Sequence, residues 1–151
     1  MEIKIYKIGA YIGLSVILNF ISNYLESDYL INFLKDKIVE LLITLMAINT
    51  ATSSIIVSKI EEISKKYRVN LDPSIKEVKS STILQIWLVV FAVMTLILYK
   101  SKVIIAHFPD TYESCLNITL LTIFISAIDI LRDTGLAIFI INEKTSKKEN
   151  A

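Results

Sequence analysis

Four long stretches without a charged residue constrain this chain more than any other feature. They cover residues 8–25, 41–58, 80–99 and 114–128. A soluble helix of such length needs a charged face that recurs every three or four residues. At about 1.5 Å of rise per residue, ~20 apolar residues cross a hydrocarbon core of roughly 30 Å. The first three stretches therefore predict transmembrane helices, and the fourth does so if it continues through the charged residues that follow.

Composition agrees with this class. Hydrophobic residues make up 54% of the 151 residues and the mean hydropathy is +0.58, which is too apolar for an ordinary soluble domain. A soluble bundle that buries these helices is the alternative. We predict an all-α, polytopic membrane protein with four transmembrane helices at about residues 5–25, 38–58, 81–99 and 114–141. This domain covers residues 1–142, and residues 143–151 are expected to form a disordered cytoplasmic tail.

Two further features refine the architecture. Lys4 and Lys7 precede an apolar run, as in a secretory signal, but the small-residue cleavage pattern is missing, so we expect an uncleaved first span. Residues 59–80, between the second and third spans, predict a short helical hairpin outside the membrane. Asp72 suits the N-cap of its second helix and Pro73 suits the first helical position.

Charge distribution predicts the orientation. Four spans place both chain ends and residues 59–80 on one side of the membrane. That side carries eleven of the 16 Lys and Arg residues: Lys4, Lys7, Lys59, Lys65, Lys66, Arg68, Lys76, Lys79, Lys144, Lys147 and Lys148. The opposite side carries Lys35, Lys37, Lys100 and Lys102. Because Lys and Arg accumulate in cytoplasmic loops, we expect a bacterial-type inner membrane protein with both termini in the cytoplasm.

Polar and small residues form stripes at helical spacing in two of the spans. The stripe of the second span consists of Glu40, Thr44, Ala47, Ala51, Ser54 and Ser58. The stripe of the fourth consists of Cys115, Thr119, Thr122, Ser126, Asp129 and Asp133. Such residues gather where membrane helices pack closely. These faces are therefore expected to form a packing seam, a subunit interface or the lining of a pore.

The other two spans have fewer polar residues. In the first span, Gly9, Gly13 and Asn19 are predicted to pack against another helix. The third span has one strongly polar residue, Gln85, and is expected to be the most lipid-exposed helix.

A charged group interrupts the apolar sequence of the fourth span. Asp129 and Arg132 are three residues apart and can neutralise each other on one helix, which leaves the negative charge of Asp133. Two placements remain open, because the span can end near Leu131 and leave Arg132 and Asp133 at the interface, or run to residue 141 and bury them. Gly135 is a candidate bend between the two cases. In the second span, Glu40 can form an interfacial pair with Lys37 or contribute a carboxylate to a selectivity site.

The layout of four short spans resembles that of the small multidrug transporters. Those carry a glutamate in the first span, whereas YKIGAYIGLSVILNFISNY, residues 6–24, contains none. The layout is also similar to the small multi-span membrane proteins that accompany bacterial defence and stress systems.

Catalytic and nucleic-acid-binding motifs are missing from the sequence. Only three glycines and one histidine are present, so neither a phosphate-binding loop nor a histidine metal site is expected, and we predict no enzyme activity and no cofactor. Acidic residues interrupt the basic segment 59–80, which argues against nucleic-acid binding. The leading expectation is a homo-oligomeric channel or pore in the lipid bilayer, gated by a cytosolic protein partner at residues 59–80. An anchor or scaffold subunit that recruits a soluble partner, and a small proton-coupled transporter, are the alternatives.

Overall fold

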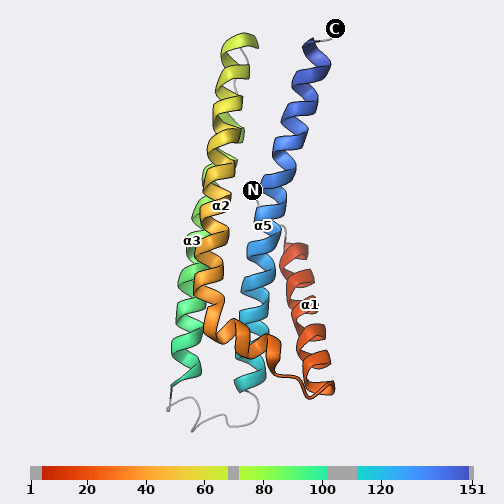
Figure 1. Cartoon of the computed structure of the whole chain (residues 1–151), viewed down its shortest axis with the longest axis vertical. Coiled ribbons are helices and arrows are strands. Elements are labelled where there is room, and N and C mark those ends of the chain that lie inside the picture. Colours follow the sequence, from red (N-terminus) through yellow and green to blue (C-terminus); the bar gives the residue numbers. More distant parts are fainter. Residues whose placement is uncertain (1–4, 68–71, 102–111, 150–151) are drawn as a thin grey trace.

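The computed structural model describes residues 5–67, 72–101 and 112–149. In these residues the chain forms four α-helices and no strand: α1 (Ile5–Tyr24), α2 (Tyr29–Tyr67), α3 (Asp72–Tyr99) and α5 (Tyr112–Glu149). Successive helices run in opposite directions, and α2, α3 and α5 form a long bundle with the shorter α1 beside α5 (Figure 1). The predicted all-α fold is confirmed.

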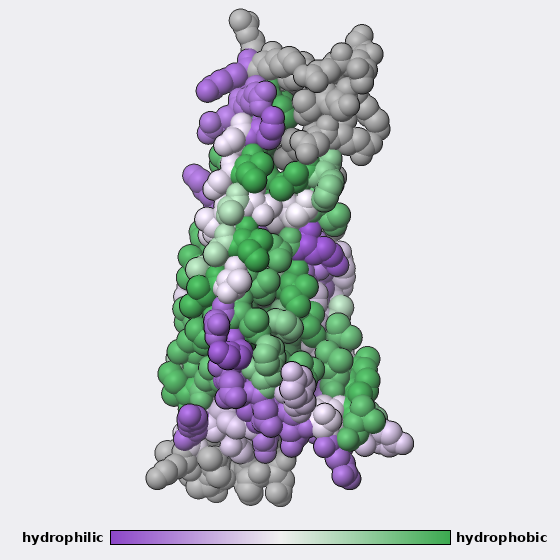
Figure 2. All heavy atoms as spheres, in the orientation of Figure 1, coloured by the Kyte–Doolittle hydropathy of each residue, from purple (hydrophilic) through white to green (hydrophobic). Residues whose placement is uncertain are grey.

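Three of these helices are long and apolar enough to cross a membrane: residues Tyr29–Lys65, Ile75–Tyr99 and Tyr112–Phe139. They indicate a membrane protein. Helix α1, with 20 residues, is not among the three. On the face that it shows, Figure 2 has a broad belt of hydrophobic side chains along the bundle and hydrophilic side chains gathered at its lower end.

The polarity of α1 is inverted relative to that of a soluble helix. Its buried side chains are Ser15, Asn19 and Ser22, whereas large apolar side chains such as Ile17 and Phe20 are exposed. Polar groups turned inward and apolar groups turned outward suit a helix that lies in lipid.

The main apolar core lies between α2, α3 and α5. It consists of Ile38, Leu42, Ala92, Leu120, Ile123 and Ala127. A second cluster of Ile31, Leu34 and Leu121 packs with Leu18 of α1. It forms where the first turns of α2 lie across the base of the bundle before the helix turns along it (Figure 1).

A tight turn joins α1 to α2. The Ser27 amide donates to the Ser22 carbonyl at 3.0 Å and the Glu26 amide to the Asn23 carbonyl at 3.2 Å, while Glu26 adopts φ 50°. This is the Schellman arrangement that ends a helix with a left-handed residue. Helix α2 then begins at Tyr29, nine residues before the predicted second span, because Ile31, Leu34, Ile38 and Leu42 continue one buried face.

Both α2 and α5 extend beyond the amino end of α1 in Figure 1. Helix α2 ends at Tyr67 and α3 begins at Asp72, while the turn of the predicted hairpin, residues 68–71, lies outside the described residues. Helix α5 passes through Gly135 unbroken and continues to Glu149, through most of the segment expected as a disordered tail. No proline or glycine follows Gly135, so no strong helix breaker interrupts it.

Candidate functional site

Two carboxylates and one guanidinium occupy a single face of α5. Asp129, Arg132 and Asp133 follow one another at spacings of three and one, which brings all three within one turn of helix. Arg132 Nη2 lies 2.5 Å from Asp129 Oδ1 and 3.0 Å from Asp133 Oδ1. The predicted Asp129–Arg132 pair is therefore present, and Arg132 also bridges to the second carboxylate.

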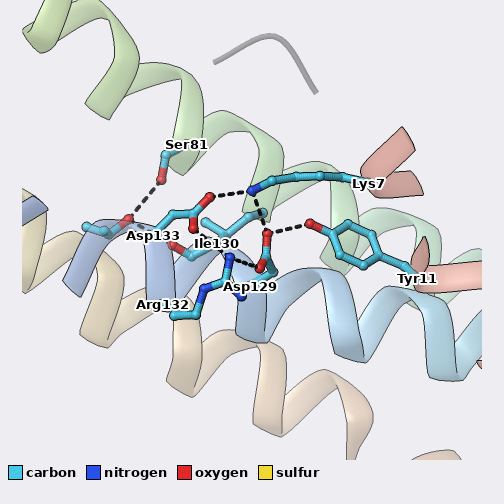
Figure 3. Close-up of polar contacts among 8 residues, drawn as sticks. Lys7, Tyr11, Ser81, Asp129, Ile130, Arg132 and Asp133 are labelled. Atoms are coloured by element: carbon cyan, nitrogen blue, oxygen red, sulfur yellow. Dashed lines mark hydrogen bonds and ion pairs between the residues drawn. The ribbon is translucent and has the colours of Figure 1, made fainter. Parts of the chain in front are cut away.

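Helix α1 supplies the partner that the sequence analysis missed. Lys7 Nζ lies 3.0 Å from Asp129 Oδ2 and 2.7 Å from Asp133 Oδ2, and the Tyr11 hydroxyl donates to Asp129 Oδ2 (Figure 3). Two cations thus face two carboxylates, so the negative charge expected to remain on α5 is balanced by a residue more than 120 positions away in the chain. These five residues are called the charge cluster below.

Exposure is graded across the charge cluster. The Asp129 side chain is 11% exposed and Arg132 is 59% exposed, with Lys7 and Asp133 between them. Figure 2 shows a hydrophilic patch in the apolar belt where the amino end of α1 meets α5. A carboxylate this enclosed needs its three donors, because a buried charge without hydrogen bonds is strongly unfavourable.

Below the charge cluster, Thr122 of the polar stripe of α5 meets α1 of the same chain, whereas Cys115 of the same stripe is exposed. Thr122 Oγ1 lies 2.9 Å from Ser15 Oγ, and Ser15 in turn donates to the Tyr11 carbonyl at 2.8 Å. Thr119 and Ser126 donate to carbonyls one turn earlier on α5. Lys7, Tyr11, Ser15, Asn19 and Ser22 stand at spacings of 4, 4, 4 and 3, so the sequence did contain the matching face of α1.

The predicted packing residues of α1 differ in their surroundings. Asn19 is buried at 6% exposure. Gly9 and Gly13 are exposed, and a Cβ at either position would meet no atom of the described chain within 4 Å. Close approach of another helix at these glycines therefore does not occur within the described part of one copy.

The stripe of α2 lies on the outside of the bundle. All six of its residues are exposed: Glu40, Thr44, Ala47, Ala51, Ser54 and Ser58. The hydroxyls of Thr44, Ser54 and Ser58 donate to the carbonyl oxygens four residues earlier, at 2.9 to 3.0 Å. These six residues are called the outer face of α2 below.

Exposed ion pairs stand at both ends of the outer face of α2. Glu40 Oε2 lies 2.9 Å from Lys37 Nζ at the lower end, and Glu62 Oε2 lies 3.0 Å from Lys59 Nζ at the upper end. The upper end is hollowed into an open pocket of about 300 Å³ lined by Ser54, Ile55, Ser58, Lys59 and Glu62.

The lower end of the bundle has a polar cluster of its own. Lys35 of α2, Tyr99 of α3 and Glu113 of α5 meet there, with Lys35 Nζ 3.4 Å from Glu113 Oε1 and the Tyr99 hydroxyl donating to the same oxygen. Lys35 Nζ also lies 4.0 Å from the centre of the Tyr99 ring. Cation–π and charged contacts therefore join three helices at this end.

Within the described residues, no group of three or more His, Cys, Asp or Glu side chains is positioned to hold a metal ion. Comparisons of the chain with protein-family models, curated proteins and solved structures find no match. The functional argument therefore depends on the geometry of the chain itself.

Proposed function

We propose that the protein is a non-enzymatic, four-span channel or pore of a bacterial-type inner membrane, assembled as a homo-oligomer with both termini in the cytoplasm. One observation carries the proposal. The outer face of α2 consists of polar and small residues, and a single copy of the chain leaves it exposed, although α2 is apolar enough to span a membrane.

Self-association explains this arrangement. Small residues such as Ala47 and Ala51 let helices approach closely, and hydroxyls and carboxylates in lipid are stabilised by another helix or by water. The opposite face of α2 is already used, because Ile38, Leu42 and Ile56 are buried against the other helices. A second copy, or the water of a pore between copies, is therefore the environment that suits the outer face.

In this proposal, the charge cluster lies at the cytoplasmic edge of the hydrocarbon core. The uncharged run of α3, residues 80–99, is long enough to span ~30 Å. Ser81 lies at the start of this run and 3.5 Å from Thr134, the neighbour of Asp133. The proximity of Asp133 to that end of α3 supports an interfacial position, where its charge costs less than at mid-membrane.

Ion flux through purified oligomer in liposomes tests the proposal. We expect salt efflux above that of protein-free liposomes. We also expect Glu40→Gln to reduce the preference of the channel for cations in a bilayer recording. The substitution leaves the positive charge of Lys37 without its counter-charge at one end of the outer face. Asp28→Asn is the matched control, since it removes a carboxylate from the same end of the molecule outside this face. Oligomer that passes no ions would overturn the channel.

A membrane anchor for a soluble protein is the second candidate. It is supported by the continuation of α2 and α5 beyond the amino end of α1 and by the open pocket between Ser54 and Glu62 (Figure 1). In that case a cytosolic protein should co-purify with the wild-type chain and be lost with Lys59→Glu, and liposomes should remain sealed.

A further inference from the structure

Five polar side chains are enclosed between α2, α3 and α5, next to the charge cluster but not part of it, and outside the outer face of α2. They are Asn49, Ser53, Ser81, Gln85 and Thr134, none more than 8% exposed. None of them belongs to the predicted stripes, and Gln85 is the one strongly polar residue of the third predicted span. These five residues are called the core polar layer.

Hydrogen bonds connect part of the core polar layer across all three helices. Asn49 Nδ2 donates to Ser81 Oγ at 3.1 Å, and Ser81 Oγ lies 3.5 Å from Thr134 Oγ1. Thr134 also donates to the Ile130 carbonyl at 3.0 Å, and Figure 3 shows Ser81 pointing toward α5 at this level.

Four buried atoms of the layer have no partner among the described residues: Asn49 Oδ1, Ser53 Oγ, Gln85 Oε1 and Gln85 Nε2. Gln85 is 3% exposed, so bulk solvent does not reach its amide. Buried polar groups in folded proteins nearly always have a hydrogen-bond partner, from the protein or from ordered water.

Apolar residues close the layer on both sides. Ser53 and Gln85 each lie one turn from the Asn49–Ser81 contact, in opposite directions along the bundle because α2 and α3 are antiparallel. Beyond Ser53 on the buried face of α2 come Ile56 and Ile60. Beyond Gln85 lies the main apolar core that includes Leu42 and Ala92.

We propose that the core polar layer binds ordered water molecules, which hydrogen-bond to Gln85, Asn49 and Ser53. The unpaired atoms decide the ligand. Gln85 offers both a donor and an acceptor, and water satisfies both, whereas a metal cation satisfies oxygen atoms alone. The inference concerns a single copy and does not depend on oligomerisation or on a pore.

Water-edited solid-state NMR of the protein in lipid tests the proposal directly. We expect magnetisation transfer from water to the Gln85 side-chain amide. The methyl groups of Ala92 and Ala127 are the internal control, because both lie in the apolar core at 0% and 1% exposure and should receive none. If the Gln85 amide receives as little magnetisation from water as these methyl groups, the proposal is overturned.

A second measurement uses the melting temperature. Gln85→Met keeps a similar length and removes both hydrogen-bonding groups. If water is bound, Gln85→Met should lower the melting temperature, because the water loses its hydrogen-bond partners on Gln85. If the layer is dry, the same substitution would raise the melting temperature by removing an unpaired amide. Thr95→Val is the control, since the buried Thr95 hydroxyl is already bonded to the Phe91 carbonyl at 2.8 Å. A higher melting temperature for Gln85→Met overturns the proposal by itself.

Exchanging the cation in the buffer distinguishes bound water from a bound ion in the core polar layer. Replacing sodium chloride by choline chloride at equal ionic strength should leave the melting temperature unchanged. A sodium-specific rise that disappears in Gln85→Met would overturn the water assignment and identify a monovalent cation site.

Discussion

At the scale of single residues, Lys7 determines whether the charge cluster is balanced. It is the only cation that α1 contributes to the cluster, and its ammonium contacts both carboxylates. The contacts are partly exposed, so solvent screens them, but Asp129 is enclosed enough that losing a donor leaves a poorly solvated charge.

We therefore expect Lys7→Met to destabilise the folded protein by about 1–2 kcal/mol, between the values typical of exposed and of buried pairs. Adding Asp133→Asn should recover part of the loss, because it removes the carboxylate that Lys7 had neutralised. A double-mutant cycle on melting in detergent measures the coupling. Lys59→Met breaks the exposed pair with Glu62 and should have little effect on melting. Additive effects of the Lys7 and Asp133 changes would show that the two residues are not coupled.

At the scale of helices, α2 is the element with two different faces. One packs inside the chain and the other, the outer face, is exposed. Helix α3 offers a comparison, because Val90 is also exposed but lies among large apolar side chains such as Phe91 and Met94.

Ala51→Leu should shift the oligomer toward monomer, since a bulky residue holds apart helices that a small one lets approach. Val90→Leu should leave assembly unchanged. Chemical cross-linking in native membranes, followed by light scattering of the purified protein, distinguishes the two variants. Equal weakening by both substitutions would place the subunit contact elsewhere than on the outer face of α2.

At the scale of the whole molecule, the number of crossings determines which parts face the cytosol. Helices α2, α3 and α5 are candidate spans by length and composition, and α1 decides whether the total is three or four.

Single cysteines, introduced after Cys115→Ser, test this topology with a membrane-impermeant thiol reagent. Asp28→Cys, between α1 and α2, should react in intact cells, whereas Glu61→Cys and Glu2→Cys should react only after permeabilisation. Labelling of both Glu2→Cys and Asp28→Cys from outside would mean that α1 does not cross and that the protein has three spans.

The sequence by itself determined the helical class and most of the helix positions. Uncharged runs of suitable length are a property of local composition, so the predicted first and third spans end within one residue of α1 and α3, at Tyr24 and Tyr99. The Asp129–Arg132 pair was also predictable, because residues three apart on one helix are neighbours whatever surrounds them.

Tertiary structure alone decided which polar face meets which. The stripes of α2 and α5 look alike in sequence, yet Thr122 and Asp129 face α1 while Thr44 and Ser54 are exposed. Helical spacing shows that residues share a face, but the neighbour of that face depends on how all four helices pack. For this reason Lys7 reaches Asp129 and Gln85 is enclosed between helices.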